Sequence, residues 1–159
     1  LGIVRGLQEA PVSQSKQETD LTIPLDAMAG VVRRRSLMFV ISDFCGPTGW
    51  ELALGRLGRR HEVLAIRIHD PGESELPDLG NLWLEDAETG SQLFIDTGDQ
   101  GFRERLGQAA AERRTSLGAA FRKARVDALE LSTADDLALV LLGWAQTRRY
   151  RKSRTGAIP

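Results

Sequence analysis

The sequence predicts an α/β fold in three layers, in which helices cover both faces of a parallel sheet. Apolar, strand-like runs lie at residues 37–41 and 63–68, and a helical pattern lies between them. A strand, helix and strand in that order are typical of a crossover between parallel strands, because the connection is too long for a hairpin. A third short strand is expected at residues 126–131, so at least three parallel strands form half of a doubly wound sheet.

The helices of the first half are predicted from their apolar spacing and their ends. Residues 1–17 form a lead-in without a clear pattern. A helix follows, in which Leu25, Met28 and Val32 lie on one face and Arg33-Arg34-Arg35 lie at the end. The next helix is expected to begin at Thr48, which has the capping-box spacing to Glu51, and to end near Arg59-Arg60.

The second half combines an inserted hairpin with two helices. Alternating apolar residues over about 81–96 flank a polar turn and predict a β-hairpin. A long amphipathic helix is expected over 101–125, and residues 132–136 are expected to cap a last helix. Residues 151–159 form a basic tail. Three strands alone would leave one edge of the sheet open, so we expect upstream strands or a second copy of the chain to cover it.

Composition limits the classes of protein to which the chain can belong. Its 159 residues suit one domain, and its formal charge of -1 indicates no overall attraction to nucleic acid. A single cysteine, Cys45, excludes an intrachain disulfide and favours a reducing, cytoplasmic setting. No apolar stretch approaches the roughly 20 residues that span a bilayer. The chain begins at Leu1 rather than at methionine, so we expect it to be a piece of a longer protein.

Asp43 is the first candidate functional residue, because it follows a buried strand directly. Ligands collect at the carboxyl ends of parallel strands. A carboxylate there can bind magnesium, accept a phosphoryl group or cap the next helix. Phosphoryl acceptance is the weaker alternative, since such enzymes carry a second carboxylate two residues later and this chain has Cys45 there.

Cys45 suggests a catalytic thiol, and the basic end of the chain suggests nucleic-acid or lipid contact. A Cys–His pair would require His69 to reach across from the neighbouring strand, and no set of histidines suits zinc. The run from Arg148 to Arg154 could hold phosphates, but the remainder of the chain is not basic and carries no nucleotide-binding glycine loop. Two alternatives remain. One is an enzyme that uses the region of Asp43 and Cys45, and the other is a basic tail that binds nucleic acid or lipid.

Several ordered motifs point to one family. They are Glu18-Thr19-Asp20-Leu21, Arg33-Arg34-Arg35-Ser36-Leu37-Met38-Phe39-Val40-Ile41-Ser42-Asp43-Phe44, Asp70-Pro71-Gly72-Glu73-Ser74-Glu75-Leu76-Pro77, Leu84-Glu85-Asp86-Ala87-Glu88-Thr89-Gly90 and Leu131-Ser132-Thr133. With these motifs, residues 18–150 resemble the bacterial family catalogued as domain of unknown function fifty-eight, a von Willebrand factor A-like group. The resemblance implies the C-terminal part of a von Willebrand factor A-like, Rossmann-like domain that is truncated at its N-terminal half.

The resemblance also implies a function in protein binding without a catalytic reaction. A-type domains bind magnesium at a metal-ion-dependent adhesion site, and Thr19 and Asp43 match two of its ligands. Its Asp-x-Ser-x-Ser motif is missing, so the chain alone should hold no cofactor, whereas the full-length protein could bind magnesium. Ser42 and Asp70 are further candidate binding residues at the strand ends. The expected partner is a MoxR-type AAA+ ATPase, and the full-length protein is expected to be membrane-anchored upstream.

Overall fold

The computed structural model describes residues 19–85 and 90–155, and the side chains up to residue 148. The expected lead-in at 1–17, the tip of the hairpin and residues 156–159 lie outside this part of the chain. The elements are α2 (Thr22–Val31), β1 (Leu37–Ser42), α3 (Trp50–Arg60), β2 (Glu62–His69), the 3-10 turn η1 (Pro71–Glu73), β3 (Asn81–Glu85), β4 (Gln92–Asp96), α4 (Gln100–Ala124), β5 (Asp127–Ser132) and α5 (Leu137–Thr155).

The three long apolar strands form one parallel sheet in the order β1-β2-β5. Leu37 pairs with Glu62 at the start of β1, and His69 pairs with Ser132 at the end of β2. The predicted crossovers and parallel sheet are therefore confirmed. Strand β2 is central, and its side chains are buried from Val63 to Arg67.

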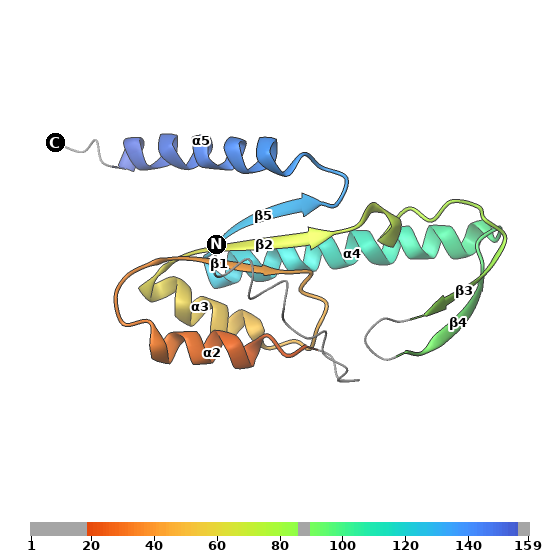
Figure 1. Cartoon of the computed structure of the whole chain (residues 1–159), viewed down its shortest axis with the longest axis horizontal. Helices are drawn as coiled ribbons and strands as arrows, with labels where there is room; N and C mark the ends of the chain where they lie inside the picture. Colours follow the sequence, from red (N-terminus) through yellow and green to blue (C-terminus); the bar gives the residue numbers. More distant parts are fainter. Residues whose placement is uncertain (1–18, 86–89, 156–159) are drawn as a thin grey trace, which may run out of the picture.

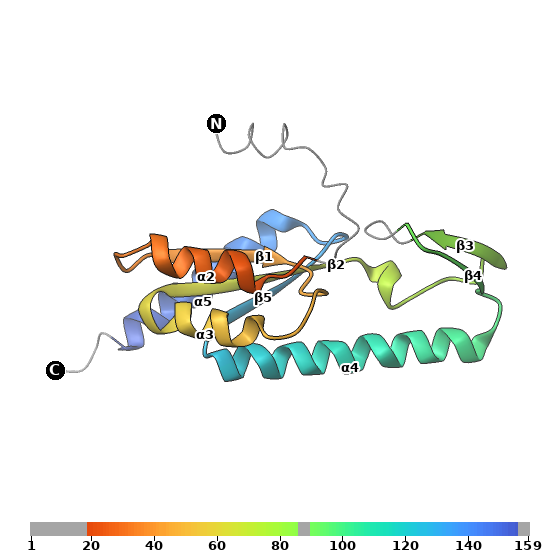
Figure 2. The same cartoon turned by 90° about the horizontal axis from the view of Figure 1, so that it is seen from below.

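Helices cover both faces of this sheet (Figures 1 and 2). Alternate residues of β2 point to opposite faces, as the pleat requires. Val63 and Ala65 pack with α2, α3 and α4, whereas Leu64 and Ile66 form a second core with β5 and α5. This arrangement confirms the three layers predicted from the sequence.

The hairpin predicted at about 81–96 is present but forms a separate sheet. Strands β3 and β4 pair only with each other, and Trp83 lies opposite Phe94. At the base of the hairpin, the buried hydroxyl of Thr97 accepts from the amide of Leu79 at 2.8 Å and donates to the carbonyl of Gly80 at 2.7 Å. The hairpin lies beyond the carboxyl edge of the parallel sheet, beside the start of α4 (Figure 1).

Three local predictions were wrong. Helix α3 begins after Gly49, whose φ of 114° only glycine adopts easily, and Thr48 makes no capping bond. Glu51 nevertheless reaches back and accepts from the amide of Gly49 at 2.8 Å. Helix α2 ends at Val31, so Arg33-Arg34-Arg35 lie in the loop that follows it rather than in its last turn. Helix α5 continues to Thr155, so the first residues assigned to a basic tail, 151–155, are helical.

Candidate functional site at the carboxyl edge of the sheet

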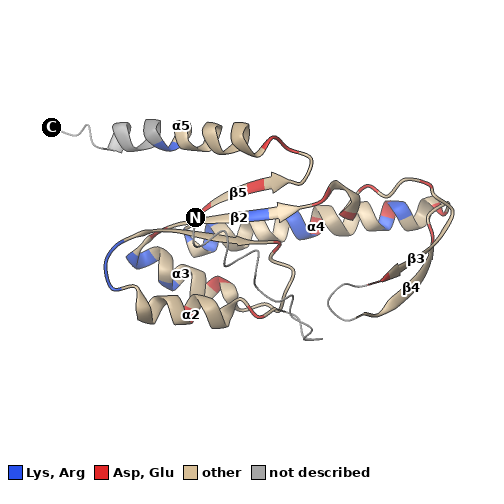
Figure 3. Ribbon diagram, viewed as in Figure 1, with Lys and Arg blue, Asp and Glu red and all other residues tan. Residues whose placement is uncertain are grey.

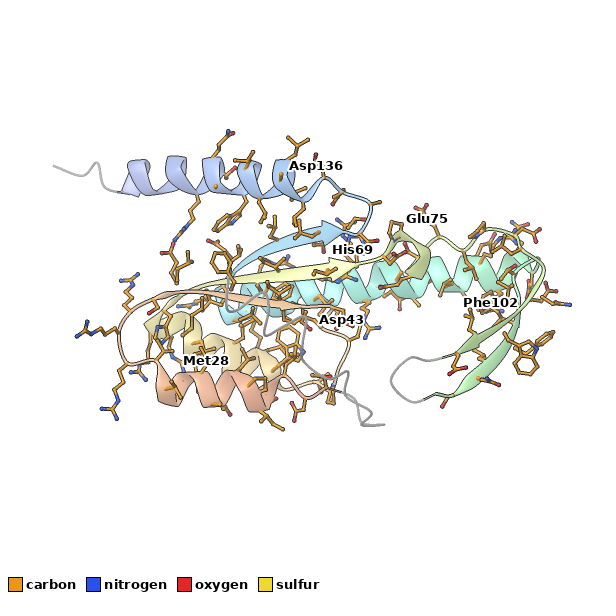
Figure 4. All side chains as sticks on the ribbon, viewed as in Figure 1. Met28, Asp43, His69, Glu75, Phe102 and Asp136 are labelled. Atoms are coloured by element: carbon orange, nitrogen blue, oxygen red, sulfur yellow. The ribbon has the colours of Figure 1, made fainter. Side chains whose placement is uncertain are left out.

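The parallel strands end at one edge, and this edge carries most of the candidate residues. Ser42 is the last residue of β1 and Asp43 follows it, Asp70 follows β2, and Thr133 follows β5. Figure 4 shows Asp43 and His69 at neighbouring strand ends. The geometry expected for ligand binding in parallel sheets is therefore present.

Ser42 and Asp43 use their side chains to shape the turn after β1. The hydroxyl of Ser42 accepts from the amide of Phe44 at 3.0 Å. The carboxylate of Asp43 accepts from the amide of Cys45 at 3.0 Å and from the Ser42 hydroxyl at 3.3 Å. These contacts stabilise the turn itself rather than the start of the next helix, α3, whose N-cap is Gly49. The Asp43 side chain remains exposed.

The packing of Phe44 fixes the backbone conformation of this turn. Its φ of 57° lies in the left-handed region, which is costly for a residue with a side chain. Its ring is buried and lies 4.9 Å from the rings of Trp50 and Phe121, measured between centroids. This aromatic packing holds the strained backbone and thereby orients Asp43 beside it.

Thr19 lies at the same edge as Asp43. A side chain at Gly46 would meet the Thr19 carbonyl oxygen at 2.2 Å, so the backbone of Thr19 packs against the loop that follows Asp43. The two proposed metal ligands therefore come from segments that contact each other. The contact runs through the Thr19 backbone.

Asp70 is tied to the neighbouring strand end rather than to Asp43. One carboxylate oxygen accepts from the Thr133 hydroxyl at 2.6 Å, and the other accepts from the amide of Gly72 at 2.8 Å. These two hydrogen bonds lower the pKa of Asp70 below its ordinary value, the Thr133 bond having the larger effect. The sequence did not indicate Thr133 as the partner, because the two residues are 63 positions apart.

Within the described residues, no group of three or more His, Cys, Asp or Glu side chains is arranged to hold a metal ion. Thr19 and Asp43 are two oxygen donors, and magnesium requires near-octahedral coordination. The side chains of this part of the chain therefore do not fit a resident magnesium ion on their own.

The surroundings of the exposed Cys45 raise the pKa of its thiol above the ordinary value. Burial raises its pKa most, and the nearby carboxylate of Asp43 raises it further, while Arg113 opposes these effects. Its sulfur contacts the carbonyl of Asp43 at 3.8 Å. The environment therefore favours the protonated form, not the thiolate that a nucleophile requires.

Sequence reasoning missed a cluster of charged residues beneath this edge. Arg67 is a buried residue of β2 that faces α4, and its Nη1 lies 3.6 Å from Glu130 of β5. Arg114 of α4 pairs with the other oxygen of Glu130 at 2.8 Å. The signal was visible, because Arg67 interrupts an otherwise apolar strand.

Arg148, the first residue of the basic run, has a structural partner. Its Nε donates to Glu62 at 2.9 Å, and its guanidinium lies 5.2 Å from the ring of Trp144. The other side chains of the run, from Arg149 to Arg154, lie outside the described side chains. Across the described residues, no helix has the length and apolar character required to span a membrane.

Comparisons with known proteins place the chain in a bacterial context. A family model described as "Protein of unknown function DUF58" matches residues 2–116. An uncharacterized protein of Mycobacterium avium is 35% identical over 147 residues, which are 92% of this chain and 86% of that protein. Uncharacterized proteins of Mycobacterium bovis and Mycobacterium tuberculosis are each 33% identical over 147 residues, and the chain spans only 46% of their length. No solved structure matches the chain.

Proposed function

The chain belongs to the DUF58 family, and from this premise we propose that it is a protein-binding module without a catalytic reaction. The raised pKa of Cys45 supports a non-catalytic role, because the thiolate is disfavoured. The partner that we propose is a MoxR-type AAA+ ATPase, and this proposal comes from the family resemblance alone.

The observation that carries the proposal is the apolar surface of the β3-β4 hairpin. Trp83 and Phe94 are 70% and 53% exposed, although their rings lie 5.1 Å apart on one face. On the other face, Leu84 and Leu93 are also exposed. Clustered exposed aromatic residues are typical of binding surfaces, and tryptophan is enriched among the residues that dominate binding energy.

The open edge of β1 offers a second surface for the same function. Among the described residues, β1 pairs with β2 on one side only, and Leu37, Phe39 and Ile41 are exposed on the face toward α5. Unpaired edges readily take up another strand. We propose that a strand from the remainder of the longer family members, or from a second copy of this chain, covers this edge.

Magnesium binding is part of the proposal for the longer family members. Thr19 and Asp43 would supply two oxygen ligands, and residues outside this chain would supply the others. A magnesium titration of such a longer protein tests this, because Asp43→Ala should abolish binding and an unchanged affinity would reject the assignment.

The hairpin proposal is tested with the purified MoxR-type ATPase of the same organism. We expect the double variant Trp83→Thr, Phe94→Thr to bind at least about tenfold more weakly, which corresponds to about 1.4 kcal/mol. Threonine preserves strand propensity, and neither ring belongs to the two cores of the parallel sheet. The control is Leu139→Thr, which changes an exposed leucine of α5. Equal affinity of the double variant and the control would contradict the role of the hairpin.

A further inference from the structure

Arg67 is a buried cation whose charge is only partly compensated. Its side chain is 8% exposed, and Glu130 lies 3.6 Å away, beyond the distance of a good hydrogen bond. Glu130 also forms an ion pair with Arg114, at the shorter distance of 2.8 Å. The Nε of Arg67 is buried and has no hydrogen-bond partner in the part of the chain that the structure describes. Burying an incompletely paired cation is costly, so this arrangement requires an explanation.

Two cavities flank the Arg67 side chain. The first has a volume of about 220 Å³ and lies toward His69, Asp70 and Glu130. The second has a volume of about 470 Å³ and lies toward Cys45 and Arg113. Arg67, Glu73 and Ala110 line both cavities. A water molecule occupies about 30 Å³ in the liquid, so each cavity has room for a small polar group.

The cavities exist because α4 presents small residues to this end of the sheet. Gly107 and Ala111 line the first cavity, Ala109 lines the second, and Ala110 lines both. A side chain at Gly107 would lie 3.7 Å from the carbonyl of Ser74, so α4 passes close to the loop after η1. The space is therefore bounded by backbone on one side and by Arg67 on the other.

The lining charges of the second cavity favour an anion with a single charge. The two cavities together are lined by three arginines and three carboxylates, so these charges balance overall. Glu130 is paired most closely with Arg114, and both residues line the first cavity. The second cavity is lined by Arg67, Arg113 and the single carboxylate of Glu73, which leaves an excess of one positive charge there. A carboxylate would balance this excess, whereas a doubly charged phosphate would exceed it.

We propose that the second cavity beside Arg67 forms a binding site for a carboxylate group. Guanidinium groups bind carboxylates through two parallel hydrogen bonds, and a lysine cannot reproduce this geometry. The carboxylate comes either from a free small molecule or from an acidic side chain of a protein. The site requires no divalent ion and no contact with the hairpin, so it stands independently of the proposed partner.

Thermal unfolding of the intact chain tests the site, with propionate as the probe and chloride at equal ionic strength as the reference. We expect saturating propionate to raise the Tm by about 2–4 °C, because a ligand that binds only the folded state stabilises it. Phosphate at the same ionic strength should raise it less. Arg67→Lys should weaken propionate binding at least about tenfold.

A substitution on α4 tests the site without altering Arg67. Ala110→Leu places a larger side chain where both cavities meet and keeps a good helix former, so the variant should fold and should lose the response to propionate. Ala119→Leu, at an exposed position on the same helix outside both cavities, is the control and should retain the response. No response in the wild type, equal responses in both leucine variants, or an equal response to phosphate would overturn the proposal.

A second probe separates the two sources of the carboxylate. N-acetylglutamic acid α-amide carries one side-chain carboxylate between two peptide-like groups. Tighter binding of this compound than of propionate indicates an acidic side chain of a protein, and tighter binding of propionate indicates a free small molecule. For either probe, the binding counts only if the Ala110→Leu substitution abolishes it.

Discussion

At the residue scale, the carboxyl edge of the sheet is built from side chains that also hold the backbone. The side chains of Asp43 and Ser42 accept hydrogen bonds from backbone amides of their own turn. The carboxylate of Asp70 accepts a hydrogen bond from the amide of Gly72 in the same manner. The sequence indicated Asp43 and Asp70 because both follow buried strands. It could not distinguish binding from turn capping, since the two uses place the same residue types at the same positions.

The hydrogen bond between Asp70 and Thr133 makes a testable prediction about pH. It lowers the pKa of Asp70 in the folded state. A lowered carboxyl pKa stabilises the fold above the unfolded pKa, and this stabilisation is lost as the pH falls through the folded pKa. We expect Thr133→Val to raise the Asp70 pKa toward its ordinary value, as measured by NMR titration of the carboxyl group.

The same variant should also be less stable than the wild type at neutral pH. The part of this difference that depends on Asp70 ionisation should vanish in acid below the folded pKa. Thr115→Val, in which the altered hydroxyl donates to the backbone of α4, serves as the control. An unchanged Asp70 pKa in Thr133→Val would show that the contact is absent in solution.

At the element scale, the helices that share one face of the sheet end at the same edge and carry cations there. Arg59 and Arg60 lie in the last turn of α3, and Arg122 and Lys123 lie in the last turn of α4. Cations at this position offset the negative end of the helix dipole. Figure 3 shows Lys and Arg around the ends of α2 and α3. For α3, the basic residues predicted at its end are therefore confirmed.

Element types were predictable because their periodicities are strong, whereas their exact ends were not. Strand β2 was predicted over 63–68 and extends one residue further at each end. Helix α3 was predicted to start at Thr48, but the left-handed backbone of Gly49 places its start at Trp50. Local patterns do not contain this information, because the aromatic packing of Trp50 with Phe44 decides how the chain enters the helix.

Helix α3 offers a matched pair of substitutions that tests the core. Leu54 is fully buried with 0% exposure, whereas Leu52 on the same helix is 67% exposed. Leu54→Ala should lower the free energy of unfolding by about 2–5 kcal/mol, because it leaves a cavity among α2, α3 and the sheet. Leu52→Ala should change it by less than about 0.5 kcal/mol. Denaturant unfolding measures both values, and similar losses would contradict the packing described for α3.

At the scale of the whole molecule, the sequence predicted the layers but not the relations between distant segments. The parallel pairing followed from the strand–helix–strand pattern, and the hairpin followed from its alternation. The contact of Thr19 with Gly46 and the pairing of Arg67 with Glu130 join residues that no local pattern connects. The candidate residues lie at one edge of the sheet, and the charged groups beneath this edge became visible only in the fold.

The open edge of the sheet leads to a prediction about association. Phe39 and Ile41 are 52% and 60% exposed beside a strand edge that is unpaired within residues 19–85 and 90–155, so exposed apolar surface and unpaired backbone groups coincide there. We expect the 159-residue chain to associate with rising concentration in sedimentation velocity. The variant Phe39→Thr, Ile41→Thr keeps β propensity and should remain monomeric, whereas Leu139→Thr should associate like the wild type. If the wild-type chain stays monomeric at high concentration, a second copy does not cover this edge. A strand of the longer family members would then remain the proposed neighbour of β1.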